Sequence, residues 1–210
     1  TVGAVVLLRG FVPEGEVDRV RELAAEEGWG VWVSEVRDPD EAPTLIRNPR
    51  WVRPIEPLFG FLVVVPAYGH VDISLPFLVF FSLFFAMIVG DAGYGALFLV
   101  LTELGARRLR RPPRRAIALL RLLAATTIGW GLLSGNVFGI EALPSLLAWA
   151  RLEWLAVDRN VIGLTFAIGA VHLTLAHLWN ALRWLNSVRA LAELGWIATT
   201  WTMYLLARQQ

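Results

Sequence analysis

The sequence of 210 residues contains no cysteine and no lysine. The first absence excludes disulfide bridges and thiolate metal sites. The second leaves arginine as the only strongly basic residue type, with nineteen basic against eighteen acidic residues. A net charge of +1 gives no reason to expect a nucleic acid as a partner.

Motifs for covalent or nucleotide chemistry are missing as well. The sequence has no Walker motif, no HExxH zinc motif and no convincing Ser/His/Asp arrangement. We therefore expect no enzyme activity from this chain by itself, no metal site and no cofactor.

Apolar residues are abundant instead. They make up 56% of the chain, the mean hydropathy is +0.56, and they concentrate in the C-terminal two-thirds. Such a composition is typical of a membrane protein. We expect a mainly α fold, with a polytopic α-helical membrane domain preceded by a small soluble lobe. The chain starts without Met and stops within an apolar run, so we expect a piece of a longer protein.

Residues 1–38 alternate between strand-like and helix-like patterns. The stretches "VGAVVLLRGFV" and "WGVWVSEV" are rich in residues that favour strands. Between them, Pro13 opens a segment with apolar residues at helical spacing, and Gly28 follows its end. The pattern predicts a small α+β lobe, about half of a ferredoxin-like domain. No export signal is visible, so we expect this lobe to be cytoplasmic.

Residues 39–75 combine prolines with a short apolar run. Five prolines fall within 39–57, which predicts an extended linker. The run "LFGFLVVVPAYG" that follows is too short to cross a bilayer, which takes about 20 residues. We expect it to be interfacial or buried.

Residues 76–210 contain four apolar regions separated by polar or basic stretches. These regions cover 76–106, 116–138, 161–178 and 194–210. The first is interrupted by "GDAGYG", whose three glycines and one Asp favour a tight turn. We expect the first region to form a helical hairpin and each of the others to form one span.

The stretch "RRLRRPPRR" connects the first two apolar regions. Its six arginines are Arg107, Arg108, Arg110, Arg111, Arg114 and Arg115. A loop with so many positive charges is predicted to stay in the cytoplasm. With a cytoplasmic lobe before the hairpin and a cytoplasmic loop after it, the number of crossings between them must be even. We also expect Glu103 to pair with Arg107 and Arg121 to extend toward the lipid headgroups.

Asp91 lies in the middle of the most hydrophobic part of the chain. A charge at the bilayer centre costs on the order of 2.5–3.5 kcal/mol even on a lenient scale. Two interpretations are open: Asp91 caps the second helix of the hairpin, or it lines an aqueous ion path. The turn motif around it consists of Gly90, Asp91, Gly93, Tyr94 and Gly95.

Two histidines are the other ionisable candidates within the apolar regions. His172 and His177 are five residues apart, so on a helix they point to different faces. For each histidine, a structural hydrogen bond to a neighbouring helix and a role in proton handling are both open.

Small and polar residues recur at three- to four-residue spacing in two of the predicted spans, which favours close helix contact. In the third apolar region they are Thr165, Gly169, His172 and Ala176, and in the second they are Thr127, Gly131 and Gly135.

Several motifs together resemble a known family. The stretch from "PTLIRNPRWVRPIEP" to "MIVGDAGYG" resembles the start of the membrane domain in the large stator subunit of V-type and archaeal-type rotary ATPases, called subunit a, or subunit I in prokaryotes. The shared marks are a PT…NP linker, a YG before an acidic turn, a Phe-rich run and GDxGxG. "GNVFG" and "ELGW" fit later parts of the pattern, and "LLRGFVPEGEVDRVRELA" resembles the family's last cytosolic lobe. "DISLP" departs from it, since the family often has Pro directly after the acidic residue.

The resemblance covers essentially the whole chain and favours the prokaryotic branch. It implies a non-catalytic stator membrane subunit of a rotary proton-translocating ATPase or ATP synthase. Such a subunit supports two proton half-channels beside a proteolipid ring and links them to the cytosolic arm. The implied partners are the proteolipid ring, peripheral-stalk coiled coils, a central-stalk cap subunit and the lipid bilayer, and the implied location is a bacterial or archaeal plasma membrane, crossed several times. The family's essential buried Arg lies on a later helix, so Arg189 is not that residue.

Two alternatives remain beside this implication. One is a membrane scaffold in which every polar group is structural. The other is a fragment of a secondary transporter or channel.

Overall fold

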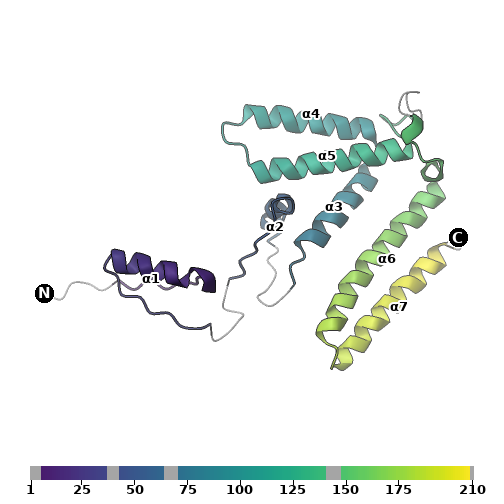
Figure 1. The fold of residues 1–210 in the computed structure, drawn as a ribbon. Coiled ribbons are helices and arrows are strands. Elements are labelled where there is room, and N and C mark those ends of the chain that lie inside the picture. Colours follow the sequence, from purple (N-terminus) through teal and green to yellow (C-terminus); the bar gives the residue numbers. More distant parts are fainter. Residues whose placement is uncertain (1–5, 37–42, 64–70, 141–147, 209–210) are drawn as a thin grey trace.

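The computed structural model describes residues 6–36, 43–63, 71–140 and 148–208, and within these ranges it is mainly helical (Figure 1). The mainly α prediction is confirmed. Parts of the predicted strands and linker, and the "YG" of the family resemblance, lie outside the described residues. The α-helices are α1 Val17–Glu26, α2 Glu56–Leu62, α3 Ser74–Val89, α4 Ala92–Arg108, α5 Arg114–Ser134, α6 Asp158–Arg183 and α7 Val188–Arg208. Short 3-10 turns are η1 Glu14–Glu16, η3 Arg53–Ile55, η4 Ala148–Ala150 and η5 Glu153–Ala156.

The N-terminal segment contains one helix but none of the expected strands. α1 forms where the sequence predicts it, and Gly28 follows its end with a φ of +70°, a conformation that glycine adopts without steric cost. The segments on either side of α1 are extended but unpaired within residues 6–36. Leu8 and Trp32 are 93% and 91% exposed, so no larger sheet or layer covers them. The predicted half-ferredoxin lobe is therefore wrong for these residues, because two short strands without further neighbours are only marginally stable.

The segment before α3 is folded into the helical core, which differs from the extended linker expected from its prolines. Pro54 and Pro57 lie in the first turns of η3 and α2, where a missing N–H costs nothing. Ile55 is fully buried and Val52 is 2% exposed. The cluster that buries them is made of Val52, Ile55 and Phe59, Leu78 from α3, and Leu119 and Leu123 from α5.

The helices α3 and α4 meet at a sharp bend of 118° between Val89 and Ala92. Both pack mainly against α5 (Figure 1). α3 runs along α5 in the same direction, since Leu78 packs near the start of α5 and the Thr126 hydroxyl lies 3.4 Å from the carbonyl oxygen of Ser82 further on.

α4 runs back along α5 in the opposite direction. Gly95, near its start, lies against Ile128, and Glu103, near its end, pairs with Arg121. The two arms therefore follow α5 in opposite directions. The start of α3 and the end of α4 both lie near the N-terminal end of α5.

The helices α6 and α7 form an antiparallel pair (Figure 1). The indole N–H of Trp201 donates to the Thr174 hydroxyl over 2.9 Å and joins them. By length and composition, α5 and α6 could each cross a membrane, and the bent pair α3 and α4 could be either a broken span or a re-entrant loop. α7 has 21 residues but does not reach the same hydropathy, so the predicted span at 194–210 stays a prediction.

Candidate functional site

Asp91 occupies the joint between α3 and α4. Gly90 ends α3 in the left-handed conformation, with φ of +68°, and Asp91 is extended. The Asp91 Oδ1 accepts the backbone N–H of Tyr94 at 3.0 Å, so the carboxylate caps α4. Asp91 is only 5% exposed, which shows that the carboxylate lies inside the protein.

A tight turn from Val137 to Ile140 closes over the same carboxylate. Phe138 and Gly139 both have positive φ, 52° and 72°, and the backbones of Val137 and Ile140 exchange two hydrogen bonds. The N–H of Phe138 donates to Asp91 Oδ1 at 2.9 Å and that of Gly139 to Oδ2 at 2.7 Å. A left-handed residue other than glycine costs roughly 1–2 kcal/mol, and here that conformation turns two N–H groups toward one negative charge.

Glycine allows the backbones at the joint to approach closely. A Cβ on Gly131 would lie 1.9 Å from the backbone nitrogen of Ala92, and one on Gly95 would lie 2.8 Å from the backbone nitrogen of Ile128. The Ala92 N–H donates to the carbonyl oxygen of Asn136 at 2.9 Å. The close-packing face predicted on α5 is confirmed at Gly131.

The rest of the turn motif also contacts the second turn. A Cβ on Gly93 would meet the Phe138 ring at 2.6 Å, and the Tyr94 ring packs edge-on to Phe138 with centroids 5.7 Å apart. We refer to residues 90–95 and 136–139 together, with Gly131, as the Asp91 joint. Sequence reasoning singled out "GDAGYG" and "GNVFG" separately. The contact between the two motifs was missed, because neither motif contains a local pattern that indicates which distant residues it contacts.

His172 lies where α6 approaches α3. Its ring stacks on Phe80, with centroids 4.3 Å apart and planes at 22°, and Phe84 is 6.2 Å away. The environment is aromatic, and it gives the ring a packing role between the two helices.

His177 faces α7 instead, so the two histidines do point to different faces of α6. Its Nδ1 is 2.6 Å from Oε2 of Glu193, and the two side chains are 24% and 22% exposed. Trp196 stacks nearly parallel to the ring. Sequence reasoning noted "ELGW" but missed Glu193 as the partner of His177.

A groove of about 500 Å³ lies between α6 and α7, with His177 among its lining residues. Its walls are mainly apolar, but several hydroxyl groups contribute. These come from Thr165, Thr199, Thr200 and Tyr204. Asp91 and His172 do not line this groove, so the three predicted candidates do not form one site.

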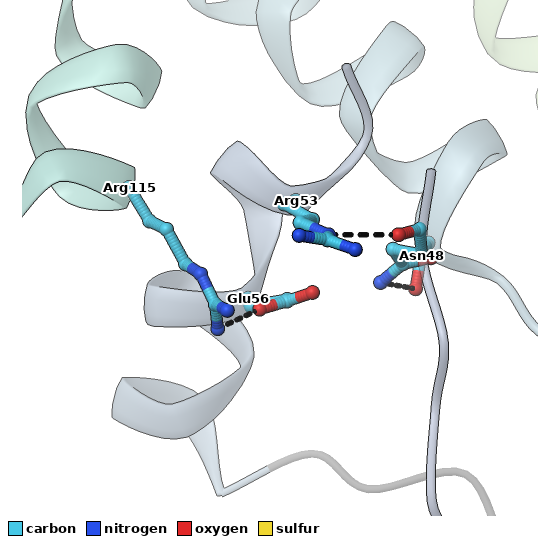
Figure 2. A network of polar contacts seen from close by, with 5 residues as sticks. Asn48, Arg53, Glu56 and Arg115 are labelled. Atoms are coloured by element: carbon cyan, nitrogen blue, oxygen red, sulfur yellow. Dashed lines mark hydrogen bonds and ion pairs between the residues drawn. The ribbon is translucent and has the colours of Figure 1, made fainter. Parts of the chain in front are cut away.

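The end of α5 near the arginine loop carries a set of ion pairs. Arg121 binds Glu103 through two contacts of 2.5 and 2.9 Å. Glu103 therefore pairs with Arg121 and not with Arg107 as expected, because the neighbouring helix presents a guanidinium in bidentate geometry. The extension of Arg121 toward the headgroups stays a prediction. Arg115 binds Glu56 of α2 (Figure 2).

The polar contacts continue from α2 into the segment before it. The Arg53 Nε–H donates to the carbonyl oxygen of Asn48 at 2.9 Å, and the buried Asn48 amide donates to the Ser74 hydroxyl at 3.3 Å (Figure 2). The segment from Asn48 to Glu56 thus lies at the arginine-loop end of α5. Across the described part of the chain, no group of three or more acidic, His or Cys side chains could hold a metal ion.

Comparison with known proteins identifies relatives over nearly the whole chain, although no family model matches it. The chain is 36% identical over 210 aligned residues to "V-type ATP synthase subunit I 1" of Treponema pallidum, an alignment that covers 94% of the chain and 34% of that protein. It is 28% identical to subunit I of the V-type ATP synthase of Borreliella burgdorferi, over 95% of the chain and 35% of the relative. It is also 28% identical to subunit I of the A-type ATP synthase of Thermococcus kodakarensis, over 97% and 34%.

The chain thus spans about a third of the length of these curated relatives, which come from both bacteria and archaea. The chain belongs to the family of V-type and A-type ATP synthase subunit I, in its prokaryotic branch.

Proposed function

We propose that this chain is part of a non-catalytic stator membrane subunit in a rotary proton-translocating ATPase or ATP synthase. The observation that carries the proposal is the alignment of 94% of the chain with a protein named as subunit I of a V-type ATP synthase. The missing nucleotide and catalytic motifs fit a subunit that performs no chemistry of its own.

In this proposal the subunit supports the proton half-channels beside the proteolipid ring and links them to the cytosolic arm. A stator must keep its shape while a rotor turns against it. The Asp91 joint supplies that rigidity, because it ties α3, α4 and the end of α5 together through buried hydrogen bonds and backbone contact at Gly131. The further partners would be the peripheral-stalk coiled coils and the central-stalk cap subunit.

The polar groups divide between two roles. Asp91 and His172 are assigned to structure, because one is saturated with backbone N–H groups and the other is stacked on phenylalanines. His177 is assigned to the proton path, because it pairs with Glu193 beside a groove that carries hydroxyl groups. An imidazole can both donate and accept a proton, which a proton path requires.

The test uses the full-length subunit in the purified ATPase complex, reconstituted into liposomes. His177→Gln is expected to lower the number of protons pumped per ATP hydrolysed, while His172→Phe, which keeps an aromatic ring against Phe80, leaves that ratio unchanged. ATP hydrolysis in detergent should be the same for both variants.

Two results would favour the alternatives. If neither histidine variant changes the pumping ratio, the scaffold interpretation holds and the groove has no ion role. If the subunit purifies without ATPase partners and alone conducts ions into liposomes, the transporter or channel interpretation replaces the proposal.

A further inference from the structure

The arginine loop between α4 and α5 holds more positive charge than the described residues around it neutralise. Two carboxylates lie near it in the described residues, and both are engaged: Glu56 with Arg115 and Glu103 with Arg121. The other five arginines of the loop are exposed and form no ion pair within the described part of the chain. They are Arg107, Arg108, Arg110, Arg111 and Arg114.

Local helix electrostatics does not explain this charge. Arg107 and Arg108 lie in the last turn of α4, where the helix dipole favours a cation. Arg114 and Arg115, however, open α5, where the dipole disfavours a cation, and no side chain caps that end. Arg115 is compensated by Glu56, but Arg114 has no ion pair within the described residues. A positive charge kept at an unfavourable helix end indicates an interaction outside these residues.

The position of the loop indicates where that interaction takes place. α5 is apolar enough to cross a membrane, and the loop directly precedes it. Leu104 and Leu109 beside the arginines are 48% and 53% exposed, so apolar surface adjoins the charge. This combination suits the boundary between acyl chains and headgroups, where arginine side chains lie with their stems in the apolar layer.

We propose that the arginine loop is a binding surface for anionic phospholipid headgroups. A planar guanidinium can donate two hydrogen bonds to one phosphate, and five exposed guanidinium groups on nine residues can hold more than one lipid. Pro112 and Pro113 restrict the backbone between the two helices, so the arginines are presented on a short, stiff connection. The proposal goes beyond the proposed function, since it assigns a lipid class and requires no proton transport.

The experiment measures lipid retained by the full-length subunit in nonionic detergent. The purified subunit is incubated with equal amounts of dioleoyl phosphatidylglycerol and dioleoyl phosphatidylcholine, which differ in headgroup charge but share acyl chains. Free lipid is removed and bound lipid is quantified by mass spectrometry. Each basic residue near a membrane contributes roughly a fivefold factor to anionic lipid binding, so we expect phosphatidylglycerol to be preferred by about tenfold or more.

The variants separate charge at the loop from charge elsewhere. Arg108→Gln, Arg110→Gln and Arg111→Gln together remove three unpaired charges and leave three arginines to fix the orientation of the loop. This triple variant should lose most of the preference, and the corresponding Lys variant should keep part of it. The control carries Arg9→Gln, Arg19→Gln and Arg21→Gln, which remove the same number of exposed arginines on and before α1, two of them in exposed pairs with Glu16 and Asp18, and it should behave as the parent.

Three outcomes would overturn the proposal. The first is equal retention of both lipids by the parent. The second is the same preference in the triple Gln variant as in the control. The third is displacement of phosphatidylglycerol by inorganic phosphate or by an acidic peptide at equal concentration, which would identify a free-anion site or a protein-binding surface instead.

Discussion

At the scale of single residues, Asp91 is a buried carboxylate held by backbone hydrogen bonds. Its two oxygens accept three backbone N–H groups, from Tyr94, Phe138 and Gly139. If Asp91 acted only as a helix cap, Asn would be nearly equivalent, because Asn also caps helices. The observed geometry removes that equivalence, because both oxygens are used and Asn has only one.

Asp91→Asn should therefore destabilise the subunit. At least one N–H, that of Gly139 in the present arrangement, would face an amide NH₂ and lose its acceptor, which costs about 1–3 kcal/mol when buried. The measurement is the thermal unfolding midpoint of the purified subunit in detergent. Asp72→Asn is the control, since Asp72 accepts the N–H of Ser74 at 2.8 Å at a less buried position. Lower proton pumping at unchanged stability would instead support the ion-path interpretation of Asp91.

Gly131→Ala should be among the most damaging single changes in the chain. A Cβ there would lie 1.9 Å from the backbone nitrogen of Ala92, and backbone cannot rotate out of the way as a side chain can. We expect a loss of about 3 kcal/mol in unfolding free energy, or no folded subunit at all.

Gly129→Ala is the matched control, two residues earlier on the same helix. A Cβ at Gly129 meets nothing within 4 Å, and Ala is favoured over Gly in a helix by roughly 0.5–1 kcal/mol. Equal unfolding midpoints for the two variants would contradict the close approach at the joint.

At the scale of elements, α5 is the helix against which α3 and α4 are aligned. The Asp91 joint fixes one end of α4 on α5, and the bidentate pair of Glu103 and Arg121 fixes the other. A charge swap tests the second contact. Glu103→Arg and Arg121→Glu should each lower the unfolding midpoint, and the double variant should recover much of the loss.

The control for the swap is the pair of Asp18 and Arg21 on α1. It is exposed and separated by 3.2 Å, and exposed pairs of this kind contribute little to stability. Swapping these two residues should leave the midpoint unchanged. Additive losses in the Glu103 and Arg121 variants, without recovery, would show that their attraction does not hold α4 to α5.

Some elements can be predicted from local sequence patterns, and others cannot. Helical periodicity and the Gly28 cap predict α1, and the glycines of "GDAGYG" predict the turn between α3 and α4. The prediction of strands beside α1 was wrong, because a composition that favours strands does not provide the neighbouring strand with which to pair. The prolines of η3 and α2 led to the wrong prediction of an extended linker. Pro breaks a helix only in the interior and is well tolerated in the first turn. The contact of Asp91 with Phe138 and Gly139 spans 47 to 48 residues, and no local pattern encodes it.

At the scale of the whole molecule, the segment before α3 and the arginine loop lie at the same end of α5. Glu56 binds Arg115 there, and Ile55 packs against the same helix end. The turn around Phe138 lies at the opposite end, beside Gly131. We therefore expect both ends of the α3–α4 pair to emerge on one side of the membrane.

Single cysteines test this arrangement in a chain that has none of its own. Leu45, Leu109 and Ile140 are 63%, 53% and 62% exposed, so cysteines there can be labelled. With a membrane-impermeant maleimide on intact cells and on inverted vesicles, Leu45→Cys and Leu109→Cys should react from the cytoplasmic side and Ile140→Cys from the other. Reaction of Leu45→Cys and Leu109→Cys from opposite sides would exclude the hairpin topology.

The separation of Asp91 from the N–H groups that bind it has a consequence during synthesis. Phe138 is added 47 residues after Asp91, which at about 5–20 residues per second is a delay of roughly 2–10 s. Throughout that interval the nascent α3 and α4 carry a carboxylate without two of its three partners. The order of synthesis thus makes the turn after α5, with Phe138 and Gly139, the last segment needed to complete the hydrogen bonds of Asp91.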